Sequence, residues 1–431
     1  MATMSREEFN RLLTQTGPGT PMGALFRRYW LPALLASELP VPDCPPVRVG
    51  LLSEKLLAFR DSDGQLGLVD EFCAHRGVSL WFGRNEMRGI RCPYHGWKYD
   101  VTGRCVEVPS EPPERGFHEK VRLKSYPLVE RGGILWAYMG PPESRPDLPE
   151  FEFATVGDDQ RYVSKRFQFC NYLQAMEGGI DPHHVAFLHG GEVSKEAMIA
   201  VEHASSYFHP ELEVKLEARE SAGGLVIAYG RDVDGGQASY WRVMHWIAPC
   251  FTLIPPFGEH PVHGHFWVPV DDEHCFAWTF DYHPRRSLTE DELDAARQGR
   301  GLHAKLIPGT FLPVANRGND YLMDRAKQAA GIHYSGIESI AMQDASLQES
   351  MGPIQDRARE TLASSDRIIV MARRALRDAA LSLQEGSTPP GADPRSHRVR
   401  SATVKLPPDA NVLDAVEAFI KVREDMGYAS V

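Results

Sequence analysis

The spacing of hydrophobic residues changes character twice along the chain. Residues 1–40 place apolar side chains at helical intervals and predict one or two helices, interrupted by the Gly- and Pro-rich turn at 17–21. Residues 47–142 instead carry short strand-like runs joined by turn residues, for example Asp63-Gly64. We therefore expect a small all-β unit to follow a helical N-terminal segment.

The second half of the chain mixes both kinds of pattern. A helical stretch at about 166–190 precedes a run of β segments at about 206–283, and helices follow at about 338–351 and 366–383. Because 431 residues are too many for one ordinary hydrophobic core, two domains are expected. Strands and helices together predict an α+β protein.

The composition is that of a globular chain with an excess of acidic residues. Hydrophobic residues make up 42% and charged residues 24%, and the net charge of −11 argues against nucleic acid and anionic membranes as partners. The N-terminal residues lack the apolar stretch of a signal peptide. No window approaches the roughly 18 apolar residues of a membrane helix, so the cytoplasm is the expected location.

Seven cysteines, an odd number, argue against a disulfide framework. Five of them stand alone and are interpreted as small buried hydrophobic residues or free thiols: Cys44, Cys105, Cys170, Cys250 and Cys275. The other two have histidines at ligand spacing, in the order Cys73-x-His75, a gap of 16 residues, and Cys92-x-x-His95.

Two loops that each supply one sulfur and one imidazole allow two kinds of metal site. One is a tetrahedral zinc site, and the other is a [2Fe–2S] cluster in which two His replace two Cys on one iron. Zinc fingers keep their Cys pair and their His pair in separate places, whereas each loop here mixes the two types. Gly77 and Gly96 allow both loops to turn tightly around a cluster. The spacing therefore favours the iron–sulfur cluster.

A second constellation lies in the stretch EGGIDPHHVAFLH, residues 177–189. His184 and His189 are five positions apart, so they can face one metal only if the helix ends or bends between them. Asp181 lies one turn before His184 and is placed to orient an imidazole. Two His and one carboxylate suit non-heme Fe(II) and leave coordination positions for O2 and substrate.

The third ligand must come from elsewhere in the chain. Asp344 is the best candidate, and Glu349 and Asp356 are the alternatives. A structural interpretation stands beside the functional one, because a lone His pair is more often structural and Asp344 could be an exposed helix acid.

Together these motifs resemble the α subunit of Rieske non-heme iron ring-hydroxylating oxygenases, most closely the phthalate dioxygenase branch. The resemblance covers nearly the whole chain. It is carried by Cys73-Ala-His75 with Cys92-Pro-Tyr-His95-Gly-Trp, by Glu177-x3-Asp181-x2-His184-x4-His189, and by Asp344-x4-Glu349. Ala74 stands where the family more often has Pro, a departure that touches no ligand.

The resemblance implies an α+β fold in three segments. Residues 1–46 would form an N-terminal helical segment packed on the catalytic domain, and residues 47–145 an all-β Rieske [2Fe–2S] domain. Residues 146–431 would form a catalytic domain with a central antiparallel sheet covered by helices, of the helix-grip type. Members of that branch use α subunits alone, as homotrimers or stacked homohexamers.

The resemblance also implies a role for each candidate residue. Cluster ligands would be Cys73, His75, Cys92 and His95, and ligands of the mononuclear Fe(II) would be His184, His189 and Asp344. Asp181 would link the sites of two subunits by accepting hydrogen bonds from His184 and from His95 of the partner subunit. NAD(P)H electrons would arrive through a separate flavin/iron–sulfur reductase, because the chain has no GxGxxG nucleotide motif, and O2 would be the co-substrate.

The aromatic stretch at residues 240–257 predicts a substrate pocket. Arg242 could bind a substrate carboxylate or make a structural salt bridge. Residues 204–212 offer His209 but no arginine, which argues against a dicarboxylate such as phthalate. A monocarboxylated aromatic compound, a diaryl ether or an alkylated aromatic compound fits as well, so hydroxylation and oxidative dealkylation both stay open. The alternative functions are a Rieske electron carrier and a zinc-stapled binding protein.

Overall fold

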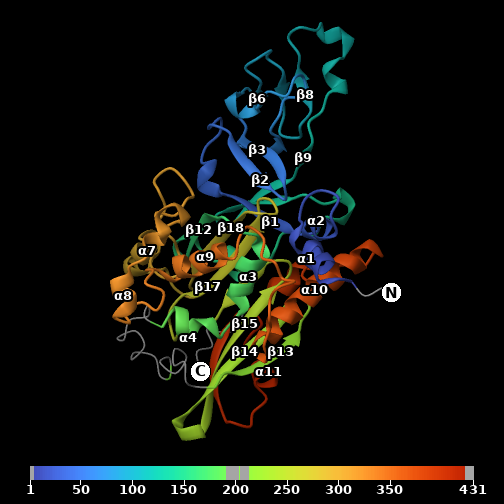
Figure 1. Cartoon of the computed structure of the whole chain (residues 1–431). Helices are drawn as coiled ribbons and strands as arrows, with labels where there is room; N and C mark the ends of the chain where they lie inside the picture. The colour runs from blue at the N-terminus through green and yellow to red at the C-terminus, as the bar shows by residue number, and fades with distance from the viewer. Residues whose placement is uncertain (1–3, 191–202, 204–212, 423–431) are drawn as a thin grey trace.

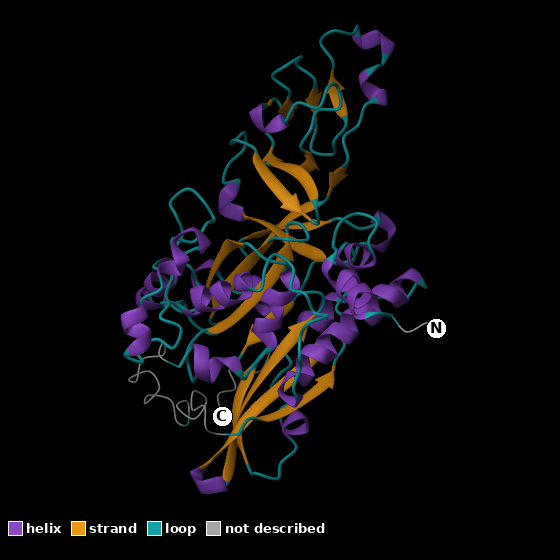
Figure 2. Cartoon of the chain, viewed as in Figure 1, coloured by secondary structure: helices purple, strands orange, loops and turns teal. Residues whose placement is uncertain are grey.

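The computed structural model describes residues 4–190, 203 and 213–422. It is elongated, with small sheets at one end and a large sheet beside most of the helices at the other (Figure 1). Figure 2 shows the same division, with the longer helices gathered around the large sheet. None of the helices in the described part of the chain combines the length and the apolar character that a membrane span needs.

The N-terminal part is built from three antiparallel sheets. One has the strand order β2 (Val47–Leu51), β3 (Glu54–Arg60), β4 (Leu66–Asp70) and β9 (Ser125–Tyr126). The second has the order β5 (Arg84–Glu86), β6 (Gly89–Arg91), β7 (Lys98–Tyr99) and β8 (Cys105–Glu107). The third has the order β1 (Trp30–Leu35), β11 (Ile134–Tyr138) and β10 (Leu128–Arg131). The hairpin predicted around Asp63-Gly64 is confirmed as β3–β4.

Residues 30–35 form a strand where the sequence pattern predicts a helix. β1 pairs antiparallel with β11, and five of its six side chains are buried. Pro32 would remove a backbone hydrogen bond from a helix interior and clash with the preceding turn. A strand buried on both faces does not alternate, so its periodicity gave no signal. The helices that the first 40 residues do form are α1 (Arg6–Thr14) and α2 (Pro21–Phe26).

One large antiparallel sheet of eight strands dominates the rest of the chain. Its order is β12 (Arg161–Gln168), β18 (Cys275–Tyr282), β17 (Val262–Pro269), β16 (Phe251–Ile254), β15 (Ala238–Ile247), β14 (Gly224–Val233) and β13 (Lys215–Glu220), with β19 (Ala402–Leu406) paired to β15. The predicted central antiparallel sheet is therefore confirmed. Residues 166–168, which were predicted to be helical, belong to β12 instead.

Helices cover this sheet. α3 (Tyr172–Ile180) packs on β16, β17 and β18, and it contacts both α9 (Ile340–Ser350) and α10 (Arg367–Gln384). α9 and α10 are the two helices predicted for this part of the chain. α1 and α2 pack on α10. The remaining α-helices of the described residues are α4 (His184–Leu188), α7 (Glu290–Arg297), α8 (Arg325–Ala329) and α11 (Val412–Ala415).

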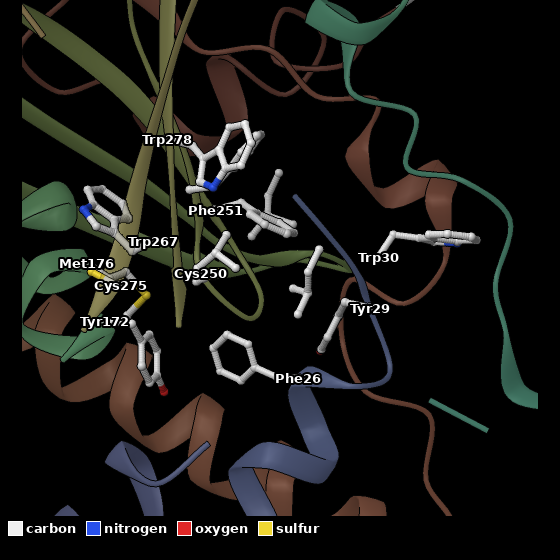
Figure 3. Packing of buried hydrophobic residues seen from close by; sticks show 14 of the residues in the cluster. Phe26, Tyr29, Trp30, Tyr172, Met176, Cys250, Phe251, Trp267, Cys275 and Trp278 are labelled. Carbon is white, nitrogen blue, oxygen red and sulfur yellow. The ribbon is translucent and has the colours of Figure 1, made fainter. Parts of the chain in front are cut away.

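The largest hydrophobic core lies between α3, the large sheet and the N-terminal segment (Figure 3). Phe26 of α2 and Tyr172 of α3 meet edge to face, with ring centroids 4.8 Å apart. Trp246 of β15 donates its indole N–H to the sulfur of Met176 at 3.1 Å. A fully buried Phe contributes roughly 2 kcal/mol through the hydrophobic effect, so this core holds α3 firmly on the sheet.

Two glycines near the end of α3 allow that close packing. A Cβ atom on Gly179 would lie 2.0 Å from the Trp267 ring, and one on Gly178 would lie 2.4 Å from the amide nitrogen of Gln348. A larger residue at position 179 would require α3 or the Trp267 ring to shift, and one at position 178 would displace the Gln348 amide, because interiors are close-packed. The helix ends before Pro182, whose ring disfavours helical backbone in the residue that precedes it.

Candidate metal centres and the cavity beside them

Two loops with the same hydrogen-bond pattern carry the Cys and His pairs. In each loop the Cys amide donates to a carbonyl five residues later, and the amide of a glycine donates back to the Cys carbonyl. The four bonds are Cys73 N to Val78 O at 2.9 Å, Gly77 N to Cys73 O at 2.9 Å, Cys92 N to Trp97 O at 2.8 Å and Gly96 N to Cys92 O at 3.0 Å. Both glycines have positive φ angles, 72° and 76°, which a side chain would strain. The loops are therefore a matched pair of tight turns.

These loops separate their side chains into a buried end and an exposed end. Cys73 and Cys92 are 3% and 2% exposed, and burial together with the neighbouring Cys73 thiol raises the pKa of Cys92. His75 and His95 are exposed, with ring centroids 4.5 Å apart. The hydroxyl of Tyr99 lies 3.2 Å from the Sγ atom of Cys73. A [2Fe–2S] cluster held here would have its thiolate-bound iron inside the protein and its imidazole-bound iron at the surface.

This separation argues against a single zinc ion between the loops. Four ligand atoms of one tetrahedral zinc lie about 3.5 Å from one another. Among the described residues, only His184, His189 and Asp344 bring three metal-ligating atoms within 4.8 Å of one another. No imidazole nitrogen of the two loops therefore comes that close to both thiols, whereas a two-iron cluster places its Cys and His ligands at opposite ends.

The second constellation gathers three side chains from two separate parts of the chain. His184 begins α4, His189 follows its last residue, and Asp344 lies in α9. The two Nε2 atoms are 3.2 Å apart, and Oδ1 of Asp344 lies 3.5 Å from Nε2 of His184 and 3.2 Å from that of His189. Three ligands bound at about 2.1 Å and at right angles would lie about 3 Å apart, so this triad fits one face of a metal ion.

The electrostatics of the triad also suit a cation. Burial disfavours a charged Asp344, but the imidazoles of His189 and His184 hold the pKa of its carboxyl well below the usual range. Burial likewise favours neutral His184, yet the carboxylates of Asp181 and Asp344 raise its pKa to about 10. Positive charge is therefore drawn to the point where the Nε2 atoms meet, and the nitrogen and oxygen donors suit divalent iron.

The other ring nitrogens of both imidazoles face hydrogen-bond acceptors. Oδ2 of Asp181 lies 3.4 Å from Nδ1 of His184, and Oδ1 accepts from the His183 amide at 2.8 Å. Nδ1 of His189 lies 2.7 Å from Oε1 of Gln343. Such acceptors leave Nε2 directed at a metal. The structure places Asp181 where the motif predicts it, whereas Gln343 was not identified from the sequence.

The alternatives to Asp344 contact other groups. Glu349 accepts a hydrogen bond from the Tyr321 hydroxyl at 2.6 Å, and Asp356 accepts one from the Ala358 amide at 3.1 Å. Neither joins the triad in the described structure. Glu177, although part of the same sequence motif as the histidines, belongs to a buried ion-pair network with Arg357, Arg373 and Glu360.

A cavity of about 400 Å³ opens beside the triad, and residues of β15, β17, β18 and α9 line it. Arg242 lies in the cavity wall and is 3% exposed. Its Nη2 atom donates to the Pro255 carbonyl at 2.5 Å, and its guanidinium carbon lies 3.6 Å from the centre of the Phe257 ring. Arg242 is thus at the predicted pocket, with part of its guanidinium held by the protein. His209 lies outside the described residues.

Two polar features of the cavity were not identified from the sequence. Arg166 of β12 lines the cavity and is 5% exposed. Asp281 of β18 lies between two imidazoles, 2.6 Å from Nδ1 of His263 and 3.1 Å from Nε2 of His303. β12 carries polar side chains at every second position, and a buried strand face made of polar residues is the signal that could have revealed Arg166.

Comparisons with known proteins cover both constellations. Residues 29–127 match the Rieske [2Fe-2S] domain, and residues 137–405 match the family described as LigXa C-terminal domain like. The chain is 36% identical to the 3-chlorobenzoate-3,4-dioxygenase oxygenase subunit of Comamonas testosteroni, over 90% of this chain and 92% of that protein. It is 35% identical to the phthalate 4,5-dioxygenase oxygenase subunit of Pseudomonas putida, over 89% of this chain and 88% of that protein.

The fold is also found among solved structures. The crystal structure of dicamba monooxygenase bound to dicamba aligns with 84% of this chain and 99% of its own, with a TM-score of 0.58 at 18% identity. The two matched families divide the chain as its metal constellations do, with the Cys–His loops in the first and the His–His–Asp triad in the second. This chain therefore belongs to the Rieske non-heme iron oxygenases, as an oxygenase subunit with a [2Fe–2S] cluster and a mononuclear iron that uses O2.

Proposed function

We propose that this chain is the terminal component of a multicomponent oxygenase that inserts oxygen from O2 into an aromatic substrate. The observation that carries the proposal is the convergence of His184, His189 and Asp344 on one point in the wall of a cavity of about 400 Å³. A cavity of this size accommodates one substituted aromatic ring. The names of the chlorobenzoate and phthalate relatives favour an aromatic carboxylate, with an aryl ether as the second candidate. The proposed reaction is monohydroxylation, dihydroxylation or oxidative dealkylation of this substrate.

In this proposal the cluster is held by Cys73, His75, Cys92 and His95, and Fe(II) is held by His184, His189 and Asp344. When bound, the two metal groups supply one-electron transfer and the activation of O2. The side chains of the protein do the remaining work. Asp181 and Gln343 hold the two imidazoles with Nε2 toward the metal. The cavity walls orient the ring, and Arg242 is positioned in the wall to contact the substrate.

We further infer that electrons cross between subunits. The β5–β8 sheet and α4 lie in opposite parts of the molecule in Figure 1. The exposed His75 and His95 are accessible to a second copy, and the side chain of Asp181 is 30% exposed, so His95 of the partner subunit could reach it. A homotrimer or stacked homohexamer would supply that neighbour. A separate NAD(P)H-dependent reductase would deliver the electrons to the cluster.

The proposal also assigns the segments of the chain. Residues 47–145 would be the cluster domain, residues 146–431 the catalytic domain, and residues 1–46 a segment that packs on the catalytic domain. The contacts of α1 and α2 with α10 support the last assignment. The pairing of β1 with β11 ties the same segment to the cluster domain as well.

Metal analysis and O2 uptake test the proposal. Anaerobically purified protein should contain about three irons and two acid-labile sulfides per chain, and the reduced protein should give the EPR signal of a His-ligated cluster. His184→Ala should keep the cluster, lose the third iron and abolish substrate-dependent O2 uptake. An iron content of two per chain that does not rise to three when Fe(II) is added would indicate an electron carrier. Zinc without sulfide would indicate a zinc-stapled protein.

A screen of benzoates, diaryl ethers and methoxylated aromatics would then identify the substrate. O2 consumption and product mass are measured together, because consumption without product reports uncoupled turnover. His184→Ala is the matched control for every compound. A wild-type protein that carries all three irons and yields no oxygenated aromatic product would contradict the proposed substrate class.

A further inference from the structure

Arg166 is a buried cation at the cavity, and its guanidinium has no hydrogen bond or ion pair to any part of the chain that the structure describes. Its neighbours on the same face of β12 do have partners. The Ser164 hydroxyl bonds Nδ1 of His303 at 2.7 Å, and the Gln168 amide donates to Gln348 at 2.6 Å. Arg166, between them and 5% exposed, lines the cavity.

An unpaired buried guanidinium is costly, because it has lost its hydration and gained no compensating contact. Burial lowers the pKa of Arg166, while the charges of Asp344 and Glu349 oppose that effect, and a guanidinium stays protonated at neutral pH. Both carboxylates are engaged elsewhere. Asp344 faces the two histidines of the triad, and Glu349 bonds the Tyr321 hydroxyl. Neither forms an ion pair with Arg166 within the described residues.

The cavity becomes more positive when iron is bound. A divalent ion held by one carboxylate, that of Asp344, leaves one net positive charge at the triad. Arg166 and Arg242 add two more cations to the walls of the same cavity. The other acids that line the cavity have partners of their own: Asp181 faces His184, and Asp281 lies between His263 and His303. Glu292 pairs with Arg286. A ligand with a negative charge would pair with the guanidinium of Arg166, which the described residues leave without a partner.

We propose that Arg166 anchors a carboxylate of the substrate beside the iron site. This inference rests on the proposed oxygenase function and adds a feature of its substrate, an aromatic acid whose charged group points toward β12. Arg242 has a different part. Its hydrogen bond to the Pro255 carbonyl and its stacking on Phe257 fix it in the wall, so Arg166 is the cation that decides between charged and neutral ligands.

A charged ligand and its neutral counterpart test this inference on the iron-loaded enzyme. Binding of benzoate and of benzamide is measured by calorimetry without O2 and without reductant. The proteins are the wild type, Arg166→Met, Arg166→Lys and Arg300→Met. Met retains most of the side-chain volume and removes the charge, and Lys retains the charge without the planar fork. Arg300 is an exposed arginine at the same cavity and provides the matched control.

Wild type and Arg300→Met should bind benzoate at least about tenfold more tightly than benzamide. This preference corresponds to the free energy that a hydrogen bond to a charged group contributes. Arg166→Met should bind the two ligands about equally, with its affinity for benzamide unchanged, and Arg166→Lys should fall between. The thermal midpoint of Arg166→Met should equal or exceed that of the wild type, because an unpaired buried charge has been removed. A structural ion-pair role predicts the opposite change in stability.

The inference would be overturned if the wild type binds benzoate and benzamide equally. It would also be overturned if the wild type binds neither ligand measurably. A preference for benzoate that survives in Arg166→Met, or that disappears equally in Arg300→Met, would overturn it too. Iron and sulfide contents of the same samples test the oxygenase proposal separately. A fully loaded enzyme without preference for the anion refutes the anchor and leaves the proposed function standing.

Discussion

The Oε1 atom of Gln343 lies 2.7 Å from the Nδ1 atom of His189. The amide nitrogen of Gln343 donates to the Ile337 carbonyl at 2.8 Å, so the group facing His189 is the amide oxygen, which can only accept. Nδ1 of His189 must therefore carry the proton, and Nε2 keeps its lone pair toward Asp344. The bond fixes the tautomer that metal binding requires before any metal arrives.

Gln343→Leu should lower the affinity of the mononuclear site for Fe(II) by about 10- to 100-fold, because the imidazole of His189 loses the acceptor that orients it. Fe(II) titration of iron-depleted protein against a competing chelator measures the change. Gln343→Glu keeps an acceptor and should retain most of the affinity. If Gln343→Leu binds Fe(II) as tightly as the wild type, packing alone orients the imidazole.

Asp181→Asn should keep both metal groups and slow turnover by about 10- to 100-fold. The charge near Nδ1 of His184 is lost, and so is the proposed link to His95 of the partner subunit. Reoxidation of the reduced cluster in a single turnover, with iron and sulfide counts on the same sample, separates electron transfer from metal loss. Asp271→Asn removes a carboxylate 2.9 Å from another imidazole and should leave turnover unchanged. If Asp181→Asn loses the third iron, the role of Asp181 is to orient His184 for metal binding and not to transfer electrons.

Tyr99→Phe should lower the reduction potential of the cluster by roughly 40 mV. A thiolate cannot donate, so the Tyr99 hydroxyl donates to Cys73, and removing a bond of about 1 kcal/mol destabilises the more negative reduced cluster. A potentiometric titration followed by EPR gives the value. Tyr126→Phe is the control, because its hydroxyl bonds Glu54 at 2.7 Å. A potential that moves equally in both variants would rule out a specific effect on sulfur.

Acid should destabilise the large-sheet domain through two buried imidazoles. Burial lowers the pKa of both His245 and His397 from 6.5 to about 4. In the unfolded chain these two imidazoles become protonated below pH 6.5, whereas in the folded chain they stay neutral until about pH 4. The contribution of these groups to the free energy of unfolding is therefore complete above pH 6.5. It decreases toward pH 4 by at most about 1.4 kcal/mol per pH unit for each group. Urea unfolding at pH 7.5 and pH 5, followed by tryptophan fluorescence, measures this loss.

His245→Gln retains a hydrogen-bond donor for the Arg400 carbonyl but cannot titrate, so it should reduce the loss of stability between the two pH values. His274→Gln changes a partly exposed imidazole and serves as the control. An unchanged pH dependence in His245→Gln would show that other groups cause the acid sensitivity.

What could be predicted from the sequence was encoded locally. The Cys73–His75 pair is two positions apart, and Gly77 alone signals the tight turn that follows. The hairpin turns and amphipathic helices likewise depend on neighbours in the chain, so the α+β class was predictable. β1 gave no signal because both of its faces are buried.

The roles of side chains that depend on contacts between distant segments of the chain could not be predicted from the sequence. Gln343 acquires its role only because folding brings it to His189, 154 positions away. Arg166 is distinguished by a guanidinium that lacks a partner among the described residues, which only the packed structure reveals. Asp344 could be preferred over Glu349 from its motif, but the distances that unite it with the two histidines are a property of the fold.

The close approach of Gly178 and Gly179 to their neighbours limits how this enzyme can be re-engineered. A methyl group at Gly179 would overlap the Trp267 ring, so a substitution there requires either the ring or α3 to shift, and α3 leads directly into the segment that carries His184. Libraries that seek new substrates should vary the cavity walls on β15 and β17 and leave the glycine pair constant. The walls contact the molecule that enters, whereas the glycine pair holds α3 close to β17 and α9 and so sets the position of the iron site relative to those walls.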